Sequence, residues 1–218
     1  MDPILRTADT PDWITILLLS SIILPVLAKS FFYGRFLNFI ILPFNNKYIF
    51  MYNKKEKLIN WFHVFFTLFQ IINFSLFVFL AGNIFFETAE ITGFFMYPLI
   101  LASILGFIFL KVILQLGNGF IFGSNKTVSE LIFKKLSYLN YTGIIMFIAN
   151  LILAYVANDS IIVVFVAIFL ILLINVIGWV TLLRNHQNFI TSYFFYFILY
   201  LCALEISPII IIGSYLKE

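Results

Sequence analysis

The chain has 218 residues, of which 63% are hydrophobic and 11% are charged, and its mean hydropathy is +1.08. Water-soluble domains carry about 25% charged residues, so this composition excludes a soluble globular protein and indicates a chain that uses lipid as its solvent. The net charge is +3, from 13 Lys and Arg against 10 Asp and Glu. We expect the lipid bilayer as a partner, and we expect no nucleic acid.

Six apolar segments are each long enough to cross a hydrocarbon layer of about 30 Å at a rise of about 1.5 Å per residue. In chain order they cover about 13–31, 61–85, 94–116, 138–156, 161–183 and 190–216. Continuous apolar runs favour helices over the alternating strands of a membrane barrel. The sequence therefore predicts an all-α bundle of about six transmembrane helices, forming one integral-membrane domain over residues 1–218.

The first segment lacks the features of a cleavable signal. Asp2, Asp9 and Asp12 outnumber Arg6 ahead of it, and no small-residue cleavage motif follows it. We expect it to remain as a membrane helix.

Basic residues give the expected orientation of the bundle. Eleven of the 13 Lys and Arg lie in or beside the first, third and fifth connections on one side, and only Arg6 and Lys217 lie opposite. Membrane proteins concentrate Lys and Arg in their cytoplasmic loops. The pattern predicts that these three connections are cytoplasmic and that both termini are not.

Residues 124–139 have a different pattern from the spans. Val128, Leu131, Ile132, Leu136 and Leu139 recur at helical spacing, with charged residues between them. This predicts a short amphipathic helix lying at the cytoplasmic surface. Two groups of basic side chains are then candidates for docking anionic lipid, the favoured reading for this helix, or a protein partner: Lys134 and Lys135 here, and Lys54, Lys55 and Lys57 in the first connection.

Glu205 is an acidic side chain well inside the last apolar segment. A charge near the membrane centre costs about 2.5–3.5 kcal/mol on insertion scales, so it is the first functional candidate. Pro208 follows three residues later and should bend or open the helix beside it, because proline has no amide hydrogen and clashes with the preceding turn. The alternatives are a structural kink with a protonated carboxyl group, ion or proton handling, and a contact with a partner subunit.

Lys29 and Lys111 are the lysines that could approach Glu205. Each lies toward the cytoplasmic end of its span, at an expected axial separation of about 13 Å from the carboxylate. Lysines in such positions extend more easily toward the membrane interface. We therefore do not favour a direct ion pair, although both lysines stay in the set of intramembrane candidates.

Other polar residues inside the spans are expected to join helices. These residues are Gln70, Asn73, Gln115, Asn150 and Asn175. A hydrogen bond between membrane helices contributes about 0.6 kcal/mol on average. A polar pathway would require several of them to share one face with Glu205.

Motifs for catalysis and metal binding are poorly represented. His63 and His186 stand near cytoplasmic helix ends without a partner at metal-ligand spacing, and we expect them to be interfacial side chains. Cys202 is the single cysteine, which excludes an intramolecular disulfide. We assign no catalytic residue, no metal ligand and no cofactor, and we expect the protein not to be an enzyme.

Three parts of the sequence resemble one family. They are the terminal stretch from Tyr196 to Pro208, Lys111 with Gly117 and Phe120–Gly123, and the opening Asp12-Trp13 with Lys29. Together they are similar to the bacterial integral-membrane family of domain of unknown function 4271. The resemblance covers nearly the whole chain and implies a multi-pass inner-membrane protein of a Bacteroidota species. It implies no substrate, cofactor or catalytic residue.

Two functions remain from the sequence. The first is a non-enzymatic inner-membrane subunit or scaffold of an envelope-biogenesis or secretion assembly, which docks a membrane or cytoplasmic partner through its basic loops. The alternative is a small transporter or proton-coupled channel component that uses Glu205 as its protonatable group.

Overall fold

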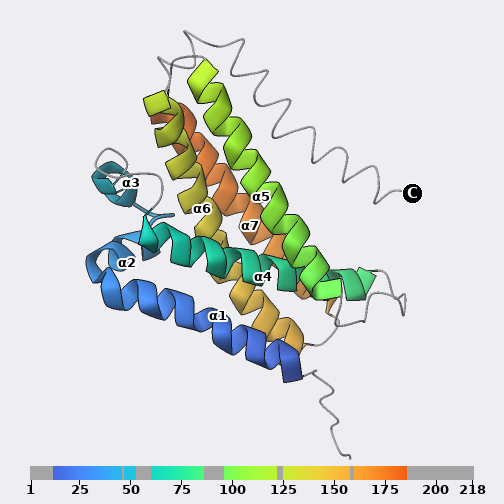
Figure 1. The fold of residues 1–218 in the computed structure, drawn as a ribbon. Helices are drawn as coiled ribbons and strands as arrows, with labels where there is room; N and C mark the ends of the chain where they lie inside the picture. Colours follow the sequence, from blue (N-terminus) through green and yellow to red (C-terminus); the bar gives the residue numbers. More distant parts are fainter. Residues whose placement is uncertain are drawn as a thin grey trace, which may run out of the picture. The chain divides into compact units, whose positions relative to one another are not determined.

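The computed structural model describes residues 12–45, 47–52, 60–85, 96–121, 125–157 and 160–185, and within these ranges the chain is helical without strands. The elements, shown in Figure 1, are α1 (Asp12–Phe31), α2 (Tyr33–Ile40), α3 (Lys47–Tyr52), α4 (Trp61–Phe85), α5 (Met96–Ile121), α6 (Asn125–Leu151), the π-helical turn η1 (Ile152–Val156) and α7 (Ile161–Asn185). The chain divides into two compact units, Met1–Gly178 and Trp179–Glu218.

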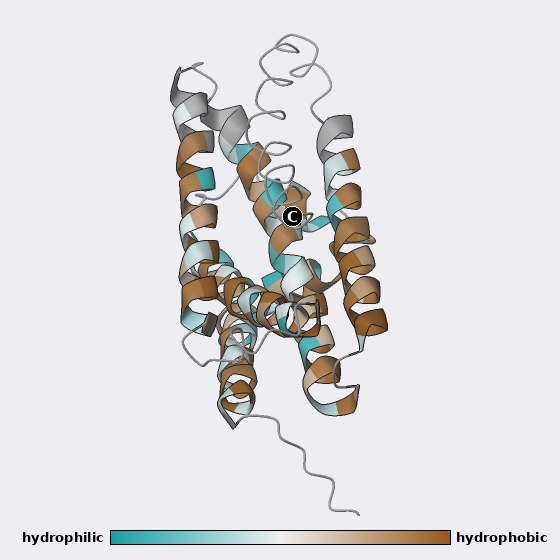
Figure 2. Cartoon of the chain, turned by 90° about the vertical axis from the view of Figure 1, so that its right-hand side faces the viewer, coloured by the Kyte–Doolittle hydropathy of each residue, from teal (hydrophilic) through white to brown (hydrophobic). Residues whose placement is uncertain are grey.

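Five described helical stretches are long and apolar enough to cross a membrane. They cover Trp13–Phe31, Trp61–Phe85, Met96–Leu114, Ser129–Val156 and Ile161–Thr181. In Figure 2 most residues of these helices are apolar, and a few polar residues interrupt the apolar stretches along them. The all-α, multi-pass membrane architecture expected from composition is confirmed. The sixth predicted span, 190–216, lies outside the described residues.

Helices α4 and α6 form the centre of the first unit. They make the most extensive contact between any two helices, and α1, α5 and α7 pack around them. In the most apolar part of α4, 50% of the residues are buried, and in that of α6 the share is 44%. In the most apolar part of α5 only 6% of the residues are buried. Lipid-exposed side chains such as Leu99 and Phe109 therefore cover most of α5.

Aromatic rings fill much of the interior. Phe39 of α2 packs against Phe62 and Phe66 of α4, with ring centroids 5.6 and 4.4 Å apart. Trp13 of α1 packs against Phe79 of α4 at 5.4 Å. Offset and edge-to-face pairs of this kind add about 0.5–1.5 kcal/mol to the burial of the rings. The rings hold α1 and α2 against α4.

The connection between α1 and α4 contains two short helices, α2 and α3. Phe32 has φ −134° and ψ 50°, outside the helical region, and it separates α1 from α2. Helix α3 then buries Tyr48 and Ile49, which are 0% and 1% exposed. The sequence prediction treated this segment as a cytoplasmic loop and missed both short helices.

The surface helix predicted at 124–139 is not a separate element. Helix α6 runs without a break from Asn125 to Leu151 and so joins this segment to the span predicted at 138–156. Neither proline nor glycine occurs between Asn125 and Thr142, so nothing in the sequence ends the helix. Lys134 is only 5% exposed, so it is not the surface residue that the sequence predicted.

Candidate functional site

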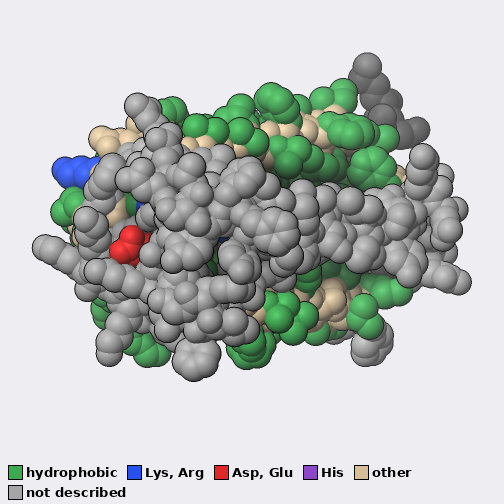
Figure 3. All heavy atoms as spheres, turned by 90° about the horizontal axis from the view of Figure 1, so that it is seen from above, with side chains coloured by type: hydrophobic (Ala, Val, Ile, Leu, Met, Phe, Trp, Pro, Cys, Tyr) green, Lys and Arg blue, Asp and Glu red, His purple; other side chains and the backbone are tan. Residues whose placement is uncertain are grey.

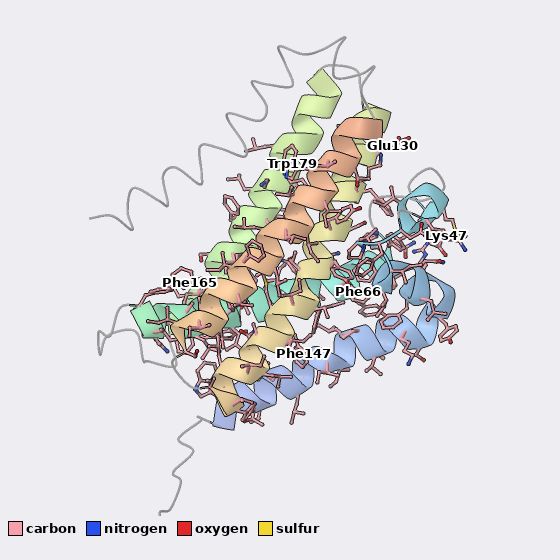
Figure 4. All side chains as sticks on the ribbon, turned by 180° about the vertical axis from the view of Figure 1, so that it is seen from behind. Lys47, Phe66, Glu130, Phe147, Phe165 and Trp179 are labelled. Atoms are coloured by element: carbon pink, nitrogen blue, oxygen red, sulfur yellow. The ribbon has the colours of Figure 1, made fainter. Side chains whose placement is uncertain are left out.

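A row of polar residues follows the contact between α4 and α6. We call this row the polar seam, and it consists of Thr67, Gln70 and Asn73 of α4 with Asn140, Gly143 and Asn150 of α6. The α4 members are spaced by three residues and lie along one i, i+3 row of the helix. Phe66 on α4 and Phe147 on α6, labelled in Figure 4, lie near the crossing of the two helices.

At one end of the seam, the side chains of Thr67 and Asn140 are hydrogen-bonded to each other. The Thr67 hydroxyl donates to Asn140 Oδ1 at 3.2 Å, and Asn140 Nδ2 donates to the Thr67 oxygen at 3.1 Å. Asn140 is 0% exposed. Because buried polar groups are costly unless they are paired, this reciprocal contact fixes how the two helices face each other.

In the middle of the seam, the two backbones approach closely at Gly143. A Cβ atom added to Gly143 would lie 3.0 Å from both Cα and Cβ of Gln70. Small residues permit this approach between membrane helices, where packing replaces the hydrophobic effect as the driving force. The approach leaves the Gln70 side chain 1% exposed.

At the other end, Asn150 connects the helices through a main-chain acceptor. Its Nδ2 donates to the carbonyl oxygen of Asn73 at 2.9 Å, and Asn73 Nδ2 donates to the carbonyl oxygen of Phe69 at 2.9 Å. The interhelical bond predicted for Asn150 is therefore confirmed. Asn175, by contrast, donates to Ile171 O within its own helix at 2.8 Å.

Three side-chain oxygens of the seam have no hydrogen-bond partner. They are Gln70 Oε1, Asn73 Oδ1 and Asn150 Oδ1, and Asn73 and Asn150 are both 0% exposed. An unsatisfied buried acceptor costs about 1–3 kcal/mol, and native structures contain few of them. Three in one short stretch make the seam the strongest candidate for a binding site among the described residues.

A second polar cluster lies where α3 meets α4. The Tyr48 hydroxyl is 3.2 Å from His63 Nε2, and His63 Nδ1 has no partner. The guanidinium of Arg35 lies 4.6 Å from the ring centre of Tyr52. Burial raises the pKa of Tyr48 above its ordinary value, while the positive charge of Arg35 opposes that rise. Tyr48 is therefore a neutral hydroxyl that can donate to His63.

This cluster corrects the prediction for His63. The side chain is 3% exposed, and its ring packs 4.6 Å from the ring of Phe133, so it is a core residue and not an interfacial one. Burial lowers the pKa of Arg35 from its ordinary value, and the neighbouring Tyr48 and Tyr52 oppose that shift. No pattern in the sequence indicates this arrangement, because its members come from α2, α3 and α4, and the first two lie in the predicted loop.

The sequence-predicted basic candidates occupy several places. Lys29 is exposed in the last turn of α1. Lys111 of α5 and Lys135 of α6 interact through their side chains, next to the buried Lys134. Lys111 also lies 5.8 Å from the ring centre of Phe107. The structure thus joins two lysines that the sequence had assigned separate roles.

The remaining candidates lie outside the described residues. They are Glu205, Pro208, Lys54, Lys55 and Lys57. Within the part of the chain that the structure describes, no group of three His, Cys, Asp or Glu side chains could hold a metal ion.

Comparison with known proteins places the chain in a family. A family model described as Domain of unknown function (DUF4271) matches residues 14–216. The chain belongs to this family. The match begins at the third residue of α1 and includes all the later described helices in full, and it confirms the resemblance seen in the sequence. No curated protein and no solved structure matches the chain.

Proposed function

We propose that this DUF4271 protein is a non-enzymatic, multi-pass subunit or scaffold of an assembly in a bacterial inner membrane, and that it docks its partner through its basic end. The observation that carries this proposal is the gathering of three lysine side chains, Lys111 of α5 with Lys134 and Lys135 of α6, about three turns from the ends of these helices that the short connection at 122–124 joins. Basic groups set between membrane helices attract anionic partners and lipid head groups.

The segment between α1 and α4 carries further lysines, and we include them with Lys111, Lys134 and Lys135 in what we call the basic end. Lys47 on α3 and Glu130 near the start of α6 lie toward the same side of the first unit in Figure 4, away from Phe165 near the start of α7. Among the described residues in Figure 3, basic and acidic side chains are visible toward one end of the view, and apolar side chains line its two long edges. Lys54, Lys55 and Lys57 follow α3 in the sequence and add three charges to the same predicted cytoplasmic side. An acidic protein segment is the partner chemistry that fits.

Co-purification tests the docking proposal. We expect a stoichiometric partner to accompany the wild-type protein after mild solubilisation, and we expect the triple variant Lys54→Glu, Lys55→Glu and Lys57→Glu to lose it. The matched control reverses Arg6 and Lys217, the two cations predicted on the opposite side. Equal partner recovery with both variants would contradict docking at the basic end.

The polar seam favours a second candidate function, that of a small transport or channel component. Buried amide oxygens without a hydrogen-bond partner can line an ion or solute pathway. Separately, the sequence offers Glu205 as a protonatable group for such a function. Proton-dependent flux into proteoliposomes tests it. Glu205→Gln should abolish the flux, whereas Glu130→Gln, which changes a carboxylate on α6 outside the seam, should leave it intact.

A further inference from the structure

The three unpartnered oxygens of the polar seam are held within a short distance along the helices. Gln70 and Asn73 are three residues apart on α4, a rise of about 4.5 Å. Asn150 is tied to this turn by its hydrogen bond to Asn73 O, and Gly143, two turns earlier on α6, touches Gln70. The same face of α6 therefore contacts both Gln70 and Asn73 of α4.

The side-chain groups without a partner in this part of the seam are all hydrogen-bond acceptors. The Nδ2 groups of Asn73 and Asn150 are already used, one within α4 and one across to it. What remains on these two side chains and on Gln70 are carbonyl-type oxygens with vacant lone pairs. An anion would be repelled by these oxygens, whereas each of them can accept a hydrogen bond from water or coordinate a cation. A single cation placed among them would engage all three.

The ligand set selects a monovalent cation. The seam contains no carboxylate, thiolate or imidazole, and tightly bound Ca²⁺, Mg²⁺ or Zn²⁺ requires such ligands. Neutral carbonyl oxygens are the groups that replace the hydration shell of alkali ions in channel filters. We infer that Gln70 Oε1, Asn73 Oδ1 and Asn150 Oδ1 bind an alkali cation, Na⁺ or K⁺, between α4 and α6.

Direct binding to the purified full-length protein tests the inference. The protein is captured from detergent onto scintillation beads and exposed to ²²Na⁺ or ⁸⁶Rb⁺, the latter standing in for K⁺, in N-methylglucamine chloride. We expect saturable binding of one of the two ions, about one per chain, displaced by the same unlabelled ion and not by Mg²⁺. The absence of saturable binding of both ions would overturn the site.

Variants locate the bound ion. Binding should raise Tm by about 2–4 °C over N-methylglucamine at equal ionic strength. Gln70→Met, which keeps the side-chain length and removes the oxygen, should lose this rise, and so should Asn73→Leu. Asn175→Leu is the matched control, since it removes an amide of α7 outside the seam that is bonded within its own helix; the ion-dependent rise should persist in this variant. A rise that survives in both Gln70→Met and Asn73→Leu would place the ion elsewhere and refute the proposal.

The binding test is independent of partner docking. A cation that binds in the seam of a protein that retains its partner supports both proposals. Loss of the partner in the lysine triple variant with an unchanged ion-dependent Tm shows that the two surfaces act separately.

Discussion

Gly143 of α6 lies directly against the main chain of Gln70 on α4, so that an added Cβ would come within 3.0 Å of the Gln70 Cα. The obstacle is a backbone atom at the centre of the most buried helix pair, and it cannot move aside as a flexible side chain would. The contact sets the separation between the two central helices and, with it, the geometry of the polar seam.

Substitution of Gly143 by alanine should therefore destabilise the protein. We expect the free energy of unfolding in mixed micelles to fall by about 1–3 kcal/mol, the usual cost of overpacking a core. Gly106→Ala is the matched control, because an added Cβ at Gly106 of α5 meets nothing within 4 Å. That change should leave stability unaltered or raise it by up to about 1 kcal/mol through helix propensity. Equal effects at both positions would argue against a close approach at the seam.

The Thr67–Asn140 pair should show coupling in a double-mutant cycle. Thr67→Val and Asn140→Leu each leave a buried partner without its hydrogen bond, whereas the double variant leaves none. We expect a coupling energy of about 0.6 kcal/mol, and at most about 1.7 kcal/mol, the range found between membrane helices. Unfolding free energies of the four proteins provide the measurement, and strictly additive losses would contradict the reciprocal contact.

Tyr48→Phe should cost more than the same change at a lipid-exposed tyrosine. It removes the hydroxyl 3.2 Å from His63 Nε2 and leaves both ring nitrogens of that buried side chain without a partner, for a loss of about 1–3 kcal/mol. The control is Tyr155→Phe, which removes a 2.7 Å bond to Thr15 at an exposed site. Combining Tyr48→Phe with His63→Phe should restore much of the lost stability, since no polar group then remains unpaired.

The sequence predicted the class of the fold because length and apolarity alone define a membrane helix. The predicted span at 61–85 coincides with α4, and that at 161–183 differs from α7 by two residues at its end. The prediction of a separate surface helix at 124–139 was wrong, because helical periodicity is the same in a surface helix and in the first turns of a membrane span. Charge suggested a boundary at Tyr138, but the helix continues through it and Lys134 is buried.

The individual polar residues of the seam could be predicted from the sequence, but the contacts between them could not. Gln70, Asn73 and Asn150 stand out as amides within apolar runs, and this identifies them as contacts between helices. Which amides meet depends on how α4 and α6 are rotated, and that is set by Gly143, a residue with no side chain to attract notice. The cluster of Arg35, Tyr48 and His63 gave no such signal, because its members are drawn from three different helices.

Gly178→Ala should loosen the contact of α7 with α6. An added Cβ at Gly178 would lie 2.8 Å from Cγ and 2.9 Å from Cδ2 of the Tyr138 ring, which is 2% exposed and has little room to move. We expect the variant to lose about 1–3 kcal/mol of unfolding free energy. The double variant Gly178→Ala/Tyr138→Ala removes the opposing ring atoms, so the glycine substitution should cost markedly less in the Tyr138→Ala background. The same loss in both backgrounds would mean that the ring of Tyr138 is not what the new methyl group meets.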